Sequence, residues 1–148
     1  MLVHRRILRI EWAQCDPAGI VFYPQYFIIF DASTGQLFER TGLSASAIRA
    51  TYHIVGFPLI ESGAKFLLPC HFDDAVTVES QIGDWGRTSF TVRHRILKDG
   101  NIPSVEGFEK RIWASRRDDG GIKPEPVPDE VKASLSDTSG QTRLSAKA

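Results

Sequence analysis

Residues 24–42 read PQYFIIFDASTGQLFERTG, and this stretch decides the fold. Pro24 suits the first turn of a helix, where its missing N–H is not needed, and Gly42 suits the residue just after a helix. The first half of the stretch is apolar on nearly all sides, whereas a helix on a protein surface keeps a polar face. We therefore predict one long helix that the rest of the chain surrounds.

Segments with the two-residue period of β-strands flank this helix. The predicted strands are Val3 to Trp12, Ile54 to Leu68, Val76 to Trp85, Ser89 to Leu97 and Val105 to Ser115. The alternation groups Leu8, Ile10 and Trp12 on one face of the first strand, and Phe108, Ile112 and Ala114 on one face of the last. Pro58 and Gly63 should bend the second strand or give it a bulge. Turn sequences after the third and fourth strands indicate hairpins between antiparallel neighbours.

The order of these elements predicts an α+β fold, with one antiparallel sheet of about five strands wrapped around the long helix. The 148 residues fit one domain, because a second core would leave neither domain enough apolar surface. We assign residues 1–135 to that domain, which ends in a short helix from Asp129 to Leu135. Residues 136–148 are small and polar, so we expect them to be disordered.

Composition argues against several classes of protein. The 18 Lys and Arg residues balance 18 Asp and Glu residues, whereas a protein that binds duplex nucleic acid normally carries a basic excess. The longest apolar stretch is far shorter than the about 20 residues that span a bilayer. The chain starts MLVHRR, without the apolar region of a signal peptide. We therefore expect a cytoplasmic protein with neither nucleic acid nor membrane as a partner.

The cysteine and histidine pattern predicts neither a metal site nor a disulfide framework. Cys15 and Cys70 are far apart and in no CxxC pattern. The four His residues have no metal-ligand spacing with Cys or acidic partners. His94, on the apolar face of a strand, is expected to be a core or interface residue.

Residues 15–24, CDPAGIVFYP, carry the candidate chemistry. Asp16 precedes a proline and a glycine, so turn formation alone could explain it. The same turn leads into the buried helix, where the free backbone N–H groups of Tyr23 and its neighbours present partial positive charge. A carboxylate beside polarising N–H groups is the minimum equipment for acyl transfer. Both interpretations of Asp16 stay open at this point.

Residues 11–26, EWAQCDPAGIVFYPQY, strongly resemble the signature of the 4-hydroxybenzoyl-CoA thioesterase family of hotdog-fold proteins. The resemblance extends to IVGFPL at 54–59, FDD at 72–74 and WGRTSF at 85–90, and covers roughly residues 5–113. It implies an acyl-CoA thioesterase that needs no cofactor, with an aryl-CoA such as 4-hydroxybenzoyl-CoA as the best single substrate. It also implies an active site at the interface of a homodimer, and dimers that pair into a homotetramer.

The resemblance assigns roles to single residues. Asp16 would act on the thioester carbonyl, by direct attack or by activating water, while the Tyr23 backbone N–H holds the developing oxyanion. Asp31 would receive a polar substituent of the acyl group, such as a phenol hydroxyl; a structural hydrogen bond is the alternative. Arg87 matches part of a basic run that contacts the CoA nucleotide, and Ser89, just after that run, is expected to bind substrate.

Other positions are assigned less directly. Pro58 and Glu61 lie in a segment that resembles one lining the family's pocket. Glu61 is a minor candidate for a second catalytic carboxylate, with a surface position as the alternative. The nucleotide-binding run has fewer positive charges than in some relatives. Arg116 and Arg117 could replace them, with a solvated strand end as the alternative interpretation.

Three other functions compete with an aryl-CoA thioesterase. A thioesterase for short or branched aliphatic acyl-CoA would use the same Asp16, although the aromatic residues of the helix favour a flat ring. A hotdog hydratase pairs its aspartate with a histidine, and residues 11–31 contain none. A non-catalytic acyl-CoA-binding protein of this fold should have lost the carboxylate, which this chain keeps.

Overall fold

The computed structural model describes residues 1–137, in which five strands form one antiparallel sheet of order β1-β3-β4-β5-β2. The strands are β1 (Val3–Arg9), β2 (Leu59–Phe66), β3 (Ala75–Trp85), β4 (Ser89–Lys98) and β5 (Ile102–Ile112). Hairpins join β3 to β4 and β4 to β5, as the turn sequences predict. Strands β1 and β2 form the two edges of the sheet, so that the outer edge of β2 is open.

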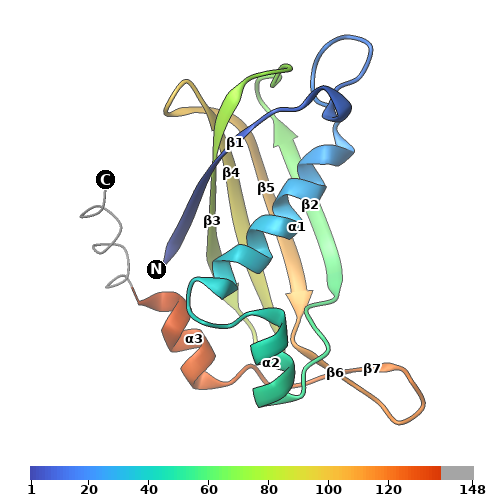
Figure 1. Ribbon diagram of the computed structural model, residues 1–148. Helices are drawn as coiled ribbons and strands as arrows, with labels where there is room; N and C mark the ends of the chain where they lie inside the picture. Colours follow the sequence, from blue (N-terminus) through green and yellow to red (C-terminus); the bar gives the residue numbers. More distant parts are fainter. Residues whose placement is uncertain (138–148) are drawn as a thin grey trace.

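The long helix α1 (Pro24–Glu39) runs across one face of the sheet, as predicted (Figure 1). Its residues Phe30 and Leu37 are fully buried. Phe30 packs with residues of β3, β4 and β5, and Leu37 belongs to a second apolar cluster with Val131 and Leu135. The chain therefore surrounds the inward side of α1 with two clusters of apolar side chains.

Shorter elements complete the structure. They are the single 3₁₀ turn η1 (Trp12–Gln14), helices α2 (Ala45–Tyr52) and α3 (Asp129–Ser136), and the small hairpin of β6 (Ala114–Arg116) and β7 (Ile122–Pro124). Helices α2 and α3 lie near the C-terminal end of α1 (Figure 1). Of the segment predicted to be disordered, Ser136 ends α3, and residues 138–148 lie outside the described residues.

The first strand is shorter than predicted. It ends at Arg9, and Trp12 lies in η1 with 69% of its surface exposed, so the predicted extension of the strand to Trp12 is wrong. The bend expected at Pro58 lies just before β2, where the register with β5 shifts between Leu59 and Glu61. At Gly63 the strand continues without a break.

The face of β5 that packs on α1 is not the one on which the sequence groups Phe108 and Ile112. Val105, Gly107 and Glu109 face α1: an added Cβ on Gly107 would lie 2.3 Å from the Phe30 ring, and Glu109 accepts a hydrogen bond from a residue of α1. Phe108 therefore lies on the other face of the sheet, where its ring covers Gly63 of β2. Apolarity alone does not identify the face of β5 that packs on α1, because that face includes the buried charged residues Glu109 and Arg111.

Among residues 1–137, no helix is long and apolar enough to cross a membrane. The same residues contain no group of three His, Cys, Asp or Glu side chains placed to hold a metal ion.

Candidate active site

A tight loop between η1 and α1 holds Asp16. Its backbone N–H donates to the carbonyl of Ile20 at 2.9 Å, and Cys15 pairs with Val21 in an isolated antiparallel bridge. Gly19 has φ of +78°, a conformation that other residues rarely adopt. The loop therefore fixes the backbone position of the carboxylate.

The two oxygens of the Asp16 carboxylate have different surroundings, and each fits one of the two interpretations that the sequence leaves open. Its Oδ1 accepts a hydrogen bond from the Ala18 N–H at 2.8 Å, which stabilises the turn. Within residues 1–137, Oδ2 accepts no hydrogen bond, and the residue is half-buried. One carboxylate oxygen holds the loop, and the other is available to a ligand.

The N-terminus of α1 follows this loop directly. Gln25 N–H donates to the Phe22 carbonyl at 2.9 Å and Tyr26 N–H to the Tyr23 carbonyl at 3.1 Å, while Pro24 has no N–H. The Tyr23 N–H donates to no acceptor among the described residues. A free N–H at a helix N-terminus suits an anionic oxygen.

An apolar hollow of about 360 Å³ adjoins Tyr23. Its walls are Ile20, Val21, Tyr23, Tyr26 and residues 66–69. The Phe66 ring lies 6.4 Å from that of Tyr23 and 5.7 Å from that of Tyr26. The hollow joins the N-terminus of α1 to the end of β2 and offers an apolar surface next to the free N–H.

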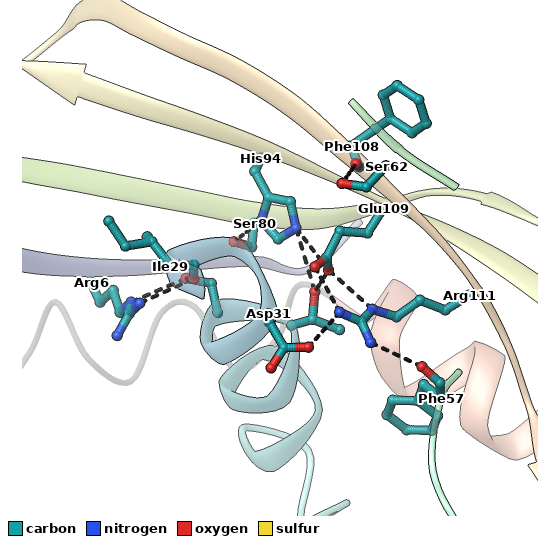
Figure 2. Close-up of polar contacts among 12 residues, drawn as sticks. Arg6, Ile29, Asp31, Phe57, Ser62, Ser80, His94, Phe108, Glu109 and Arg111 are labelled. Atoms are coloured by element: carbon teal, nitrogen blue, oxygen red, sulfur yellow. Dashed lines mark hydrogen bonds and ion pairs between the residues drawn. The ribbon is translucent and has the colours of Figure 1, made fainter. Parts of the chain in front are cut away.

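A second group of polar residues lies farther along α1, around Asp31 (Figure 2). Arg111 Nη2, from β5, donates to Asp31 Oδ1 at 2.6 Å and to Glu109 Oε1 at 2.7 Å. Arg111 Nη1 donates to the Phe57 carbonyl at 2.9 Å. Asp31 therefore has the structural partner that the sequence leaves as an alternative, although its side chain is 70% exposed.

Glu109 is the buried centre of this group. The Thr34 hydroxyl of α1 donates to Glu109 Oε2, and His94 Nε2 lies 3.3 Å from the same oxygen. Burial alone would raise the pKa of Glu109, but hydrogen bonds from His94, Arg111 and Thr34 lower it to about 2. Burial likewise would lower the pKa of Arg111, which the Glu109 and Asp31 carboxylates raise. Both groups are ionised at neutral pH.

His94 has the core position that its place in the strand predicts. It is 1% exposed and stacks on Phe30 with ring centroids 4.6 Å apart. Its Nδ1 lies 2.8 Å from the Ser80 hydroxyl. Burial lowers the pKa of His94, and the hydrogen bond with Glu109 opposes this effect only in part, so the ring is neutral at pH 7.

A cavity of about 200 Å³ opens beside Asp31 and Arg111. The remaining walls come from the second half of α1, from α2 and from residues 54–57. Most of these walls are apolar, including Phe38 and Phe57, whose ring centroids lie 4.4 Å apart. The ion pair of Asp31 and Arg111 thus lies at the edge of a mostly apolar cavity.

The other predicted site residues are spread over the molecule. Pro58 precedes β2, and its carbonyl accepts the Ile112 N–H at 3.0 Å. Glu61 is exposed on β2 opposite Lys110. Arg87 is exposed in the β3–β4 turn, and Ser89 begins β4.

One chain alone does not bring these residues together. The Asp16 loop adjoins the start of β3, through the bridge between Ile20 and His71, whereas Arg87 follows its end. Eleven residues of β3 separate these ends by roughly 36 Å at the usual rise of a strand. The structure therefore places Asp16 in the loop that leads to Tyr23 and α1, and separates this loop from Arg87 and Ser89.

Glu109 and Arg111 are site residues that the sequence analysis does not single out. They share strand parity with Val105, which is fully buried. An assignment of Val105 and Gly107 to the face of β5 that packs on α1 would have placed both charged residues beneath the helix.

Comparisons with known proteins agree with this architecture. A family model described as a thioesterase-like superfamily matches residues 10–135. The 4-hydroxybenzoyl-CoA thioesterase of Pseudomonas sp. (strain CBS-3) is 38% identical over 111 residues, 72% of this chain and 79% of that protein.

Two solved structures extend the likeness to three dimensions. A 4-hydroxybenzoyl-CoA thioesterase with one Asp replaced by Asn, in complex with 4-hydroxybenzoyl-CoA, superposes with a TM-score of 0.83 at 30% identity, over 90% of this chain and 98% of that one. A gentisyl-coenzyme A thioesterase gives a TM-score of 0.76 at 29% identity, over 89% of this chain and 99% of that one. The hotdog fold and the thioester hydrolase activity implied by residues 11–26 are thereby confirmed. The chain belongs to the 4-hydroxybenzoyl-CoA thioesterase family of hotdog-fold acyl-CoA thioesterases.

Proposed function

We propose that this protein hydrolyses an aryl-CoA thioester, with 4-hydroxybenzoyl-CoA as the best candidate, to the free acid and CoA. The observation that carries the proposal is the junction of loop and helix, where Asp16 Oδ2 and the Tyr23 N–H are both without partners in the described residues. The relatives named above act on, or were crystallised with, aryl-CoA thioesters, which supports an aryl group.

In the proposed reaction, the thioester carbonyl oxygen accepts the Tyr23 N–H. Either Asp16 attacks the carbonyl carbon, to give an acyl-aspartyl anhydride that water then hydrolyses, or Asp16 takes a proton from a water molecule that attacks. In both cases the C–S bond breaks and CoA leaves as a thiolate, which needs little help to depart. The positive end of α1 stabilises the oxyanion, an interaction whose loss typically costs about 3–4 kcal/mol. The reaction as proposed needs neither a metal nor a cofactor.

We propose that the active unit is a homodimer joined along β2. Exposed apolar residues gather there: Leu59, Ile60, Phe66, Leu67 and Leu68 are each between 45% and 54% exposed. An open edge with apolar side chains is a surface that pairs with another chain. Antiparallel pairing of two β2 strands about a twofold axis brings the end of one strand beside the beginning of the other.

This pairing would complete the site. The hollow between Tyr23 and Phe66 would face Asp31 and Pro58 of the partner subunit, because Asp31 is tied through Arg111 to the residues that precede β2. The Asp31 carboxylate would then receive the phenol hydroxyl of the acyl group. Glu61 would lie near the same interface, and Arg87 and Ser89 would contact the CoA nucleotide. Pairing of two such dimers would give a homotetramer.

The test is release of free thiol from 4-hydroxybenzoyl-, benzoyl-, phenylacetyl- and short aliphatic acyl-CoA by wild type and by Asp16→Asn. We expect an aryl preference in the wild type and a fall in kcat of about 10²–10⁴-fold in the variant. Asp84→Asn is the matched control, because Asp84 is an exposed carboxylate at the far end of β3 that pairs with Arg93. An aliphatic preference would favour the aliphatic thioesterase, and no release from any thioester would favour an acyl-CoA-binding protein.

A further inference from the structure

The Asp31 carboxylate is fixed at one oxygen and open at the other. Its Oδ1 accepts from Arg111 at 2.6 Å, whereas Oδ2 accepts no hydrogen bond from residues 1–137. The side chain is 70% exposed and borders the cavity of about 200 Å³. A hydrogen-bond donor that enters from outside α1 therefore meets a carboxylate oxygen whose orientation is already set.

All three side-chain nitrogens of Arg111 donate hydrogen bonds. Its Nε and Nη2 donate to the two oxygens of Glu109 at 3.1 and 2.7 Å, and its Nη1 donates to the Phe57 carbonyl at 2.9 Å (Figure 2). The paired contact with Glu109 fixes the plane of the guanidinium. The group is 8% exposed, so Arg111 is a rigid link between β5 and Asp31 rather than a ligand for a second anion.

Glu109 decides the net charge of the group formed by Asp31, Arg111 and Glu109. With Glu109 and Asp31 negative and Arg111 positive, the three residues together carry one negative charge. Glu109 is 2% exposed and Asp31 is the exposed member of the three, so the uncompensated charge is presented at Asp31. The Thr34 hydroxyl, which donates to Glu109, ties the same group to α1.

We propose that Arg111, supported by Glu109, is the positioning residue that makes the site prefer aryl thioesters whose ring carries a hydrogen-bond donor. The inference rests on the proposed function, in which Asp31 receives the ring substituent. A phenol hydroxyl can donate to Oδ2, whereas a plain ring would desolvate the carboxylate and return no hydrogen bond. Without Arg111, Asp31 would have to be ordered during binding, which reduces the gain from the hydrogen bond.

The experiment measures kcat and KM for 4-hydroxybenzoyl-CoA and benzoyl-CoA in wild type, Arg111→Met, Arg111→Lys, Asp31→Asn and the Asp31→Asn/Arg111→Met double variant. We expect Arg111→Met to lower the preference for the hydroxylated thioester by about tenfold, mainly through KM, and Arg111→Lys to restore part of it. The double variant should show no less preference than Asp31→Asn alone. Equal losses for both thioesters would show that Arg111 only stabilises the fold, and would overturn the proposal.

Two further measurements keep this result separate from folding and from turnover. Glu109→Gln/Arg111→Met removes both buried charges, so it tests the preference if Arg111→Met alone does not fold. Binding of the unreactive thioethers 4-hydroxybenzyl-CoA and benzyl-CoA, by isothermal titration, tests the same preference without hydrolysis. Thus loss of the binding preference in Arg111→Met supports the inference even if no thioester is hydrolysed, and an unchanged preference overturns it. Arg5→Met, which removes an exposed arginine paired with Glu79 on β3, is the control.

Discussion

At the scale of single residues, Glu109 couples the stability of the fold to pH. Its pKa is about 2 in the folded protein, against an ordinary value of 4.5, so its contribution is complete above about pH 4.5 and is lost as pH falls towards 2. The pKa of His94 is lowered from 6.5, so the unfolded chain takes up a proton there before the folded chain does. A fall in pH therefore destabilises the folded protein through both groups. His94 acts first, and Glu109 acts at lower pH.

We expect urea unfolding of the wild type to show a free energy that falls steadily from pH 7 to pH 3. The part due to Glu109 is on the order of 3 kcal/mol over its whole range. Glu109→Gln should have a lower free energy of unfolding at pH 7, because Arg111 loses its buried partner. Below pH 4.5 the free energy of unfolding of this variant should fall less steeply than that of the wild type. A wild type and a variant with the same slope below pH 4.5 would contradict the assignment.

At the scale of elements, the contact of α1 with the sheet depends on the missing side chain of Gly107. A Cβ there would lie 2.3 Å from the Phe30 ring, which is fully buried and stacked on His94. We expect Gly107→Ala to lower the free energy of unfolding by about 1–3 kcal/mol, because the ring has no space to move into. Chemical denaturation measures the loss.

Gly63→Ala is the matched control for this substitution. A Cβ at Gly63 would meet the Phe108 ring at 2.9 Å, on the other face of the sheet, where that ring is only partly buried and can shift. The cost should therefore be smaller than that of Gly107→Ala. An equal or larger loss from Gly63→Ala would show that close contact with Phe30 is not the cause.

The elements also show why sequence predicted most of the fold but not all of the site. Apolar runs and turn residues located α1, the five strands and the two hairpins, because these features depend on local periodicity. The sequence does not show which face of β5 packs on α1, because the buried residues of that face include Glu109 and Arg111, whose partners Thr34 and Asp31 lie 75 and 80 positions earlier in the chain. Pairing over such separations leaves no local pattern.

At the scale of the whole molecule, the proposed dimer makes activity depend on assembly. We expect Ile60→Lys, which places a charge among the exposed apolar residues of β2, to yield a folded chain of 16.5 kDa with little thiol release. Light scattering after gel filtration gives the mass, and circular dichroism checks the fold. Ile122→Lys, at a 47% exposed position of the β6–β7 hairpin, should keep both assembly and activity. A fully active monomer would contradict a site shared between subunits.

The buried charges of β5 also bear on how the chain finds its fold. A slip of β5 by one residue against β4 would turn Glu109 and Arg111 to the outer face and carry Lys110 beneath α1, opposite Val92 or Phe90 of β4. Such a mispaired sheet would bury a lone ammonium group and leave Thr34 without its acceptor. Apolar strands of similar length tolerate such slips more readily, since one aliphatic residue can replace another. The buried ion pair therefore selects the native strand alignment over this competing one, because only the native alignment gives each buried charge a partner.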